Sequence, residues 1–268
     1  MTDRTNVVNR ASEPSLSLYY DAVSNGRRRV LVVVPALNEE RAVGGVVSEI
    51  RTLEPTLDVL VVDDGSSDET AVVARAAGAA VCSLPFTLGV GGAMRVGYRY
   101  ALHHGYNTVV QIDGDGQHDP TYIPALLAEL DHADVVIGAR FAGEGDYEVR
   151  GPRRWAMAFL GFVLTRVAGV RLSDVTSGFR AVNLRGTQIF AQHYPAEYLG
   201  DTVESLVIAA RHGCRVRQVP VSMRRRTTGQ ASQGTLRSVL YLARAVAALV
   251  LGLVRRWPSA HEAIQEIA

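Results

Sequence analysis

The side chains most able to do chemistry lie in a short acidic segment, IDGDGQHD, at positions 112–119. Asp113 and Asp115 form a D-x-D pattern, and the glycines at 114 and 116 permit tight turns that bring both carboxylates into one small volume. Two carboxylates that close together repel each other unless a cation neutralises them. Mg²⁺ or Mn²⁺ is the natural cation, since hard oxygen ligands and substrate phosphates together complete its coordination shell. The segment therefore predicts a divalent-cation site that also takes a phosphate-bearing substrate.

Two better-known motifs fit this part of the chain less well. A calcium loop of the EF-hand kind needs glycine at its sixth position and glutamate at its twelfth, where this chain has His118 and Pro124. A dinucleotide-binding G-x-G-x-x-G beginning at Gly89 fails because Met94 stands where the third glycine belongs. A purely structural acidic turn remains the alternative to a metal site.

Two further polar clusters contain side chains that can hydrogen-bond to a nucleotide. Asn38 or Glu39 can contact a ribose hydroxyl or a base edge, and Asp63 or Asp64 can accept a hydrogen bond from a base N–H. The serines at 66 and 67 are expected to cap the helix that follows them.

The elements that must position these clusters alternate along the chain. Apolar, β-branched runs predict strands, and three-to-four apolar spacing predicts helices. The strands are expected at 30–34, 58–62, 79–84, 108–112 and 134–137, and the helices at 39–53, 67–77, 91–103 and 121–131. This alternation indicates an α/β fold with a mostly parallel sheet covered by helices on both faces. Ligands of such sheets bind beyond the carboxyl ends of the strands, so the three polar clusters are predicted to meet at one edge.

The pattern changes after position 140. A glycine-rich, charged loop is expected at 141–150, an apolar helix with basic ends at 153–168, a helix at 202–212, and a strand at 215–223. Residues 234–257 predict a helix whose unbroken apolar run, 245–254, is about half as long as a bilayer span. We expect this helix to lie in the membrane interface, with a core helix or a partner-binding helix as alternatives. The chain thus divides into a tail (1–28), a catalytic domain (29–232), and an amphipathic helix and tail (233–268).

Composition and charge limit the classes of binding partner that are expected. The chain has 268 residues, 47% of them hydrophobic, and a formal charge of +1, which gives no case for nucleic acid. Basic residues crowd the end of the chain and favour an anionic surface or ligand: Arg224, Arg225, Arg226, Arg237, Arg244, Arg255 and Arg256. Two cysteines form no disulfide framework or zinc spacing, and residues 1–29 contain no signal-peptide core. A cytoplasmic, peripherally membrane-associated protein is expected.

Six segments, VVVPALNEE, VVDDGSSDET, QIDGDGQHDP, GARF, DVTSGFRA and MRRRTTGQAS, occur in an order that resembles the inverting glycosyltransferases of the GT-A fold. The likeness is to the dolichol-phosphate mannosyltransferase-like branch and runs from about position 29 to 232. It implies a Rossmann-like, mostly parallel sheet followed by amphipathic interface helices. It also implies a nucleotide-sugar donor, Mg²⁺ or Mn²⁺, a polyprenyl-phosphate acceptor, and a membrane surface or a small membrane partner protein.

The resemblance assigns roles to matching positions of this sequence. It implies nucleotide contacts at Pro35, Leu37, Glu39, Asp63, Asp64 and Asp113, with Asp113 also near the metal. It implies that Asp115 is the metal ligand and that Gln117 is the accompanying amide ligand. The family's asparagine before its G-x-G-x-A segment is missing here, because Thr87 and Leu88 precede Gly89.

Basic and acidic residues farther along complete the implied site. Arg140 matches an arginine between donor diphosphate and acceptor, and Arg226 matches a basic residue over the donor phosphates. Residues that correspond to acceptor-phosphate contacts are Arg150, Arg153 and Arg154. Relatives carry an acid early in the helix after S-G-F-R, and either Asp201 or Glu204 fills that place here.

These features lead to a hypothesis of metal-dependent, inverting sugar transfer from GDP-mannose or a UDP-hexose to a polyprenyl phosphate. An acceptor phosphate arrives largely ionised, because its second pKa is about 6, and needs no strong base. A glycosyltransferase acting on a sugar hydroxyl is the main alternative, and it would need Asp201 or Glu204 as base. A sugar-1-phosphate nucleotidyltransferase should instead have a glycine-rich basic loop where PALNEE stands. A non-catalytic, membrane-recruited binding protein would tolerate the loss of Asp115.

Overall fold

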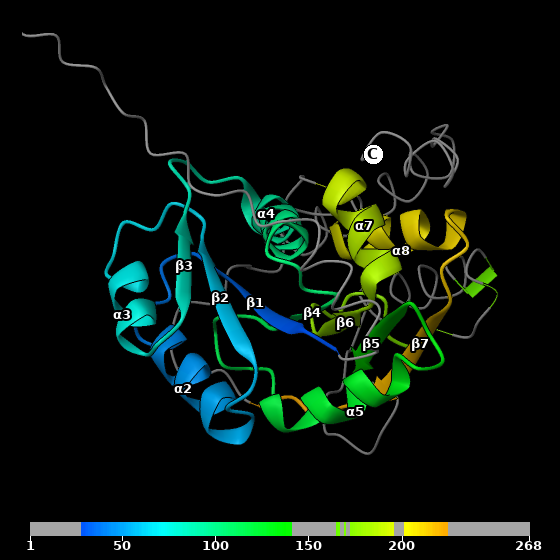
Figure 1. The fold of residues 1–268 in the computed structure, drawn as a ribbon, viewed down its shortest axis with the longest axis horizontal. Helices are drawn as coiled ribbons and strands as arrows, with labels where there is room; N and C mark the ends of the chain where they lie inside the picture. The colour runs from blue at the N-terminus through cyan, green and yellow to red at the C-terminus, as the bar shows by residue number, and fades with distance from the viewer. Residues whose placement is uncertain (1–27, 141–164, 167–168, 170–171, 196–200, 225–268) are drawn as a thin grey trace, which may run out of the picture.

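The computed structural model describes residues 28–140, 165–166, 169, 172–195 and 201–224 (Figure 1). Strands and helices alternate over most of this part of the chain. The strands are β1 (Val30–Ala36), β2 (Asp58–Asp63), β3 (Ala80–Ser83), β4 (Thr108–Gln111), β5 (Val135–Ala139), β6 (Arg180–Val182) and β7 (Val216–Pro220). The helices are α2 (Val43–Leu53), α3 (Thr70–Ala76), α4 (Gly89–His103), the 3₁₀ turn η1 (Pro120–Tyr122), α5 (Ile123–Glu129), α7 (Leu184–His193) and α8 (Asp201–Arg211).

The strands form one sheet in the order β3-β2-β1-β4-β6-β5-β7. β6 is antiparallel to both of its neighbours, whereas the other pairs are parallel. The carboxyl ends of β1, β2, β4 and β5 therefore lie at one edge, which confirms the predicted α/β fold with a mostly parallel sheet. The sequence patterns predicted neither β6 nor α7.

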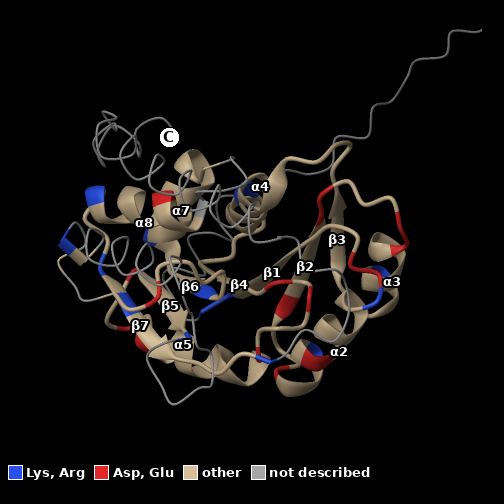
Figure 2. Cartoon of the chain, turned by 180° about the vertical axis from the view of Figure 1, so that it is seen from behind, with Lys and Arg blue, Asp and Glu red and all other residues tan. Residues whose placement is uncertain are grey.

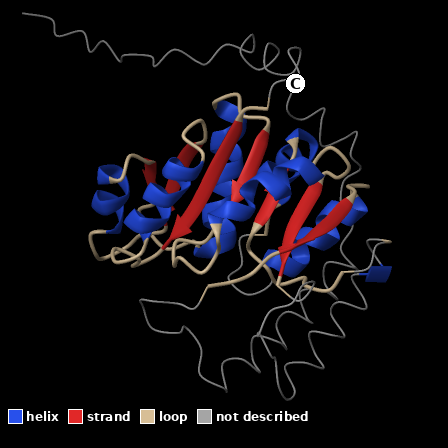
Figure 3. Cartoon of the chain, turned by 90° about the horizontal axis from the view of Figure 1, so that it is seen from below, coloured by secondary structure: helices blue, strands red, loops and turns tan. Residues whose placement is uncertain are grey.

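Helices cover both faces of the sheet, as Figures 1 and 3 show. Alternate residues of β1 enter two different cores. Leu31 and Val33 pack with residues of α4, α7 and α8, while Val32 and Val34 pack with residues of α2, α3 and α5. This period of two is what a strand buried on both faces requires.

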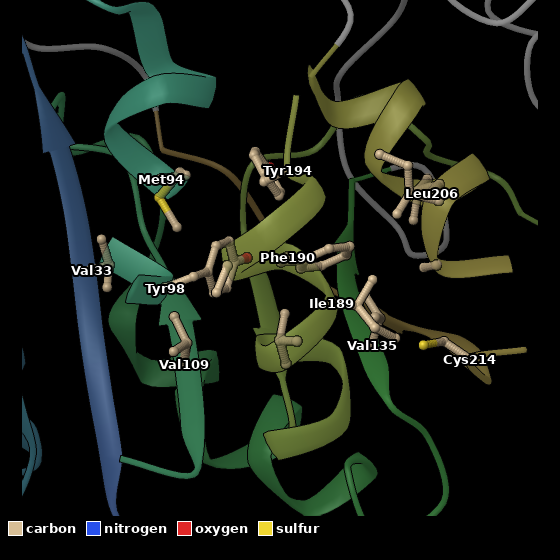
Figure 4. Close-up of a cluster of buried hydrophobic side chains, with 14 of the residues drawn as sticks. Val33, Met94, Tyr98, Val109, Val135, Ile189, Phe190, Tyr194, Leu206 and Cys214 are labelled. Atoms are coloured by element: carbon tan, nitrogen blue, oxygen red, sulfur yellow. The ribbon is translucent and has the colours of Figure 1, made fainter. Parts of the chain in front are cut away.

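An aromatic group fixes α7 against α4 on the first face (Figure 4). The ring of Tyr98 lies 5.3 Å from the rings of both Phe190 and Tyr194, in tilted arrangements favoured by aromatic quadrupoles. Gly97 allows α4 to approach the sheet, because a β-carbon there would stand 2.5 Å from Val33 Cγ1. These contacts seat α4 directly above the first strand.

Several expected segments lie outside the described residues. These are the tail at 1–27, the loop at 141–150, most of the helix at 153–168, and the amphipathic helix at 234–257. The division into three regions therefore stays a prediction. Within the described ranges, no helix combines the length and apolar character needed to cross a membrane.

Candidate active site

Three loops meet at the carboxyl edge of the sheet, where the sequence predicted that polar residues would converge. Ala36 at the end of β1 is in register with Asp63 at the end of β2, and the Asp64 N–H donates to Ala36 O at 2.9 Å. On the other side of β1, Ile112 N–H donates to Val33 O at 3.1 Å and leads the chain into the D-x-D loop. Acidic positions, red in Figure 2, lie in the loops around β1, β2 and α3.

The loop after β1 is tied to the loop after β2. Asn38 has a left-handed backbone (φ 55°), its N–H donates to Ser66 Oγ at 2.9 Å, and its side-chain oxygen accepts from Ser67 N at 2.9 Å. The Glu39 N–H donates to Thr70 Oγ1 at 2.9 Å. Ser66 and Ser67 thus brace the first loop, so the expectation that they cap the next helix is wrong. That helix begins later, at Thr70.

The side chain that meets the start of α3 is that of Asp68, which precedes the N-cap residue Glu69. The Asp68 carboxylate accepts from the N–H groups of Thr70, at 3.0 Å, and Glu40, at 3.2 Å. Burial opposes its ionisation, but the hydrogen bonds from Thr70 and Glu40 outweigh that effect and lower the pKa of Asp68. The charged carboxylate therefore joins both loops.

The two acids at the end of β2, Asp63 and Asp64, bind different parts of the chain. Both side chains are buried, and Asp64 accepts from the Leu88 N–H at 2.7 Å and the Gly89 N–H at 2.8 Å. Burial raises the pKa of Asp64, with those two hydrogen bonds acting in the opposite direction. Asp63 accepts from Ser66 N–H at 3.0 Å. Asp64 therefore fixes the start of α4. Thr87 and Leu88, which stand where the family has an asparagine, directly precede this helix.

The D-x-D loop folds back on itself. The Asp113 N–H donates to His118 Nδ1 at 3.1 Å, and His118 Nε2 lies 3.7 Å from Asp113 Oδ2. His118 is buried and stacks on Phe179, with ring centroids 5.2 Å apart. Because Nδ1 accepts the backbone hydrogen bond, a neutral His118 carries its hydrogen on Nε2, facing the Asp113 carboxylate. Asp115 Oδ1 accepts from Gln117 N–H at 3.0 Å, across a glycine at 116 with φ 75°.

Two glycines let other segments approach this loop closely. A β-carbon on Gly114 would stand 3.3 Å from both Ala36 Cβ and Pro35 O, so glycine lets the loop pass the end of β1. A β-carbon on Gly178 would stand 3.0 Å from Asp113 Oδ1. The S-G-F-R segment therefore touches the first acid of the D-x-D, a contact that hydrophobic periodicity does not reveal.

Arg140 leaves the end of β5 at the same edge and pairs with a buried acid. Its Nε donates to Asp174 Oδ2 at 2.6 Å and its Nη2 to Asp174 Oδ1 at 2.9 Å, while Nη2 also donates to Thr176 Oγ1 at 2.6 Å. The Asp174 side chain is fully buried, which opposes ionisation, but the hydrogen bonds and charge of Arg140 lower its pKa overall. Asp174 therefore fixes the direction of the Arg140 guanidinium.

Arg180 ties the same segment to α8. It is fully buried and donates to Ser177 O at 2.8 Å, Thr202 O at 2.9 Å and Ser205 Oγ at 2.7 Å. Those acceptors are neutral oxygens, so the guanidinium anchors the loop through geometry and hydrogen bonding. Its partner helix begins at Asp201 and carries the half-buried Glu204.

The donor atoms of the D-x-D loop fit a Mg²⁺ or Mn²⁺ that shares its coordination with a substrate. Within the described ranges, no three His, Cys, Asp or Glu side chains gather into a complete metal site. The Asp113 side chain is 39% exposed and Asp115 is half-buried, with the Gln117 amide two positions on. A hard cation of this kind commonly uses one or two carboxylates, waters and substrate phosphates.

The described residues do not include every predicted site residue. Arg150, Arg153, Arg154 and Arg226 lie outside them. Arg224, expected to face an anionic ligand, instead pairs with Glu49 and Asp119. The charge of Arg224 is therefore used within the chain, whereas the expectation for the rest of the basic cluster stays a prediction.

The sheet order, the converging acidic loops and the D-x-D fit a nucleotide-sugar glycosyltransferase, and comparison with known families shows that the chain is one. Residues 31–187 match the model of glycosyl transferase family 2. The chain belongs to that family.

Particular relatives are similar over much of their length. An undecaprenyl-phosphate mannosyltransferase from Micrococcus luteus is 34% identical over 212 residues, covering 76% of this chain and 86% of the relative. A polyprenol monophosphomannose synthase from Mycolicibacterium smegmatis is 32% identical over 162 residues, covering 58% of this chain and 61% of the relative.

Solved structures establish the fold. Glucosyl-3-phosphoglycerate synthase from Mycobacterium tuberculosis, solved with Mn²⁺, uridine diphosphate and phosphoglyceric acid, matches with a TM-score of 0.66. Its sequence is 21% identical, and the match covers 91% of this chain and 85% of that one. The described domain is therefore GT-A-like, as the resemblance implied.

Proposed function

We propose that this chain transfers a hexose from a nucleotide diphosphate sugar to a polyprenyl phosphate, with inversion at the anomeric carbon. The carrying observation is its 34% identity to an undecaprenyl-phosphate mannosyltransferase across most of both chains. GDP-mannose and UDP-hexoses are the first donors to test. Membrane association through residues 234–257, or through a small membrane partner protein, belongs to the same proposal.

The nucleotide is assigned to the edge where β1 and β2 end. Asp64 has both oxygens on backbone N–H groups, so Asp63 is the better placed of the two to accept from a base N–H. Glu39 is half-buried, and its backbone is held by Thr70, which suits it to a ribose hydroxyl. Pro35 and Leu37 would line the same loop.

The donor diphosphate is assigned to the D-x-D loop, with Asp115 and the Gln117 amide as ligands of Mg²⁺ or Mn²⁺ and Asp113 beside them. Such an ion, when bound, acts as a Lewis acid that stabilises the negative charge of the departing diphosphate. Asp113 enters this site already oriented, since His118 and Gly178 confine its carboxylate.

Arginines would supply fixed positive charge where the leaving group becomes more negative. Asp174 holds the Arg140 guanidinium through two hydrogen bonds, so little reorganisation is needed during transfer. Arg226 follows Arg224 by two positions in the sequence and is assigned to the donor phosphates.

The acceptor phosphate is assigned to Arg150, Arg153 and Arg154, because a guanidinium can grip a phosphate through two hydrogen bonds. A phosphate monoester is largely ionised at neutral pH, so one of its oxygens can attack the anomeric carbon without a general base. The new carbon–oxygen bond forms as the bond to the diphosphate breaks, and the nucleoside diphosphate leaves.

A sugar-hydroxyl acceptor is the second candidate. It is favoured by the placement of α8, whose first turn is anchored by buried Arg180 and carries Asp201 and Glu204. A hydroxyl nucleophile would need one of these acids as a base. One of the variants Asp201→Asn and Glu204→Gln should then abolish transfer, whereas a phosphate acceptor should leave substantial activity in both variants.

The test is incubation of the full chain with Mn²⁺, GDP-mannose, UDP-glucose or a UDP-N-acetylhexosamine, and undecaprenyl phosphate in detergent. We expect a glycolipid and one equivalent of nucleoside diphosphate for at least one donor, with undecaprenol, the matched alcohol, inactive. Asp115→Asn is the catalytic control. Transfer to the alcohol but not to the phosphate would overturn the proposed acceptor, and pyrophosphate release would overturn sugar transfer.

A further inference from the structure

The chain beyond β7 crosses the carboxyl edge of the sheet and joins the D-x-D loop. Val221 N–H donates to Ala139 O at 3.1 Å, which continues the pairing with β5. Met223 and His118 then form an isolated antiparallel bridge, and Arg224 N–H donates to Gln117 O at 2.9 Å. A segment more than a hundred positions away in the sequence therefore pairs with the backbone of the loop.

The Arg224 side chain extends this junction to a third element. Its Nη1 and Nη2 donate to the two carboxylate oxygens of Glu49 on α2, each at 2.7 Å. Nη2 also lies 2.9 Å from Asp119 Oδ1 at the end of the loop. One guanidinium thus connects α2, the D-x-D loop and the segment after β7.

The local chemistry strengthens this connection. Hydrogen bonding to Glu49 is the largest effect raising the pKa of Arg224, although burial opposes it. Burial also opposes ionisation of Asp119, but hydrogen bonds from Thr121 and the charge of Arg224 lower the pKa of Asp119 overall. The Arg224 guanidinium is therefore held by bidentate, charge-assisted hydrogen bonds.

Global stability is a weak explanation for such a cluster. The side chains of Arg224, Glu49 and Asp119 are 40%, 34% and 22% exposed, and ion pairs this open to solvent add little stability. The cluster does define the backbone between Gln117 and Asp119, directly after a glycine with φ 75° that leaves this part of the loop intrinsically flexible. Its effect should therefore be local.

We propose that Arg224 is a positioning residue that holds the D-x-D loop in its metal-binding conformation. This inference rests on the proposed function, since it assumes that Asp115 and Gln117 bind the divalent cation. Arg224 itself contacts neither the cation nor the sugar; it acts through the Gln117 carbonyl and the Asp119 carboxylate. Mutation of a residue that orients metal ligands in this way typically lowers metal affinity by about 10-fold to 100-fold.

The test measures Mn²⁺ binding to the full chain by the electron paramagnetic resonance of free Mn²⁺, in the presence of GDP or UDP. Arg224→Gln should weaken Mn²⁺ binding by about 10-fold or more. Arg217→Gln is the matched control, because Arg217 of β7 forms an exposed ion pair with Glu129 of α5. We expect that control to bind Mn²⁺ like the wild type and to have a similar Tm to Arg224→Gln.

Two further variants make the result specific. Arg224→Lys should recover part of the affinity, since lysine restores the charge but cannot reproduce the bidentate contact. Glu49→Gln should weaken Mn²⁺ binding in the same direction while leaving Arg224 beside Asp119, and it replaces Arg224→Gln if that variant fails to fold. In steady-state assays, the concentration of Mn²⁺ needed for half-maximal rate should rise more than kcat falls.

The outcomes separate this inference from the proposed function. If Asp115→Asn loses Mn²⁺ binding but Arg224→Gln and Glu49→Gln bind it normally, the role of Arg224 is refuted and the metal site stands. If Arg224→Gln and Arg217→Gln lose binding and Tm equally, the effect is general destabilisation and the role of Arg224 is again refuted. Unchanged Mn²⁺ binding by Asp115→Asn would refute the metal assignment itself.

Discussion

Replacing Asp174 with asparagine removes one charge from a buried pair and keeps the shape of the side chain. The Asp174 carboxylate accepts from Arg140 N, Nε and Nη2, at 3.1, 2.6 and 2.9 Å, and from Thr176 N at 3.1 Å. An asparagine side chain offers one accepting oxygen and turns two donors toward a guanidinium that also donates. The substitution therefore removes the carboxylate charge that faces the largely buried Arg140 guanidinium.

The size of the effect follows from the burial of both partners. The Asp174 side chain is 0% exposed and that of Arg140 is 15% exposed. Removing one member of a buried ion pair costs roughly 3–5 kcal/mol, and the partial exposure of Arg140 favours the lower end, about 3 kcal/mol. Such a loss is a large fraction of the roughly 5–15 kcal/mol by which most domains are stable.

Urea unfolding of the wild type and Asp174→Asn at several pH values measures this difference. The pKa of Asp174 is lower in the folded chain, so its stabilisation is complete above its unfolded pKa of about 3.9. It is lost as the pH falls through the lower, folded pKa. The difference in unfolding free energy should therefore be constant between pH 7 and pH 5 and should narrow only below about pH 4.

The matched control is Glu129→Gln, which breaks the partly exposed pair with Arg217. We expect it to cost less than about 1 kcal/mol. A loss below about 1 kcal/mol for Asp174→Asn at pH 7, or a difference that shrinks between pH 7 and pH 5, would refute the buried-pair reasoning. Full sugar-transfer activity in a folded Asp174→Asn protein would remove Arg140 from the catalytic proposal.

Two other predictions address the metal loop and the membrane. Gly178→Ala should displace the Asp113 carboxylate, because the new β-carbon would stand 3.0 Å from Oδ1; Mn²⁺ affinity should fall about 10-fold with an unchanged circular dichroism spectrum. Equal Mn²⁺ affinity would mean that the loop relaxes without cost or that Asp113 lies away from the ion. Deleting residues 234–268 should weaken sedimentation with anionic vesicles, and unchanged sedimentation would count against an interfacial helix.

The parts of the fold that local patterns encode were predictable. β1 and β2 are valine-rich apolar runs, and the rule that parallel strands end at one edge predicted that Asp63 and Asp113 would lie at the same edge. The sequence patterns did not predict β6, because this strand is three residues long and begins with buried Arg180. Hydrophobic periodicity expects an apolar side chain at that position. The charge is tolerated because Arg180 donates hydrogen bonds to oxygen atoms of distant α8, and such contacts leave no local pattern.

Long-range ion pairs explain the other differences. Arg224 belongs to a basic cluster in the sequence, which favours an anionic ligand, yet its partner Glu49 lies 175 positions earlier. Likewise, Asp174 lies 34 positions after Arg140, and nothing in the spacing links them. The motifs could therefore suggest candidate site residues, but they could not predict which side chains hold those residues in place.

The central claim is that a divalent cation joins Asp115 to the diphosphate of the donor. A crystal structure with Mn²⁺ and GDP or UDP, recorded at a wavelength where manganese scatters anomalously, tests it most directly. The account predicts one anomalous peak within about 2.0–2.3 Å of an Asp115 carboxylate oxygen and of a diphosphate oxygen. A diphosphate bound away from the D-x-D loop, or a manganese peak with no Asp115 oxygen in its coordination shell, would contradict it.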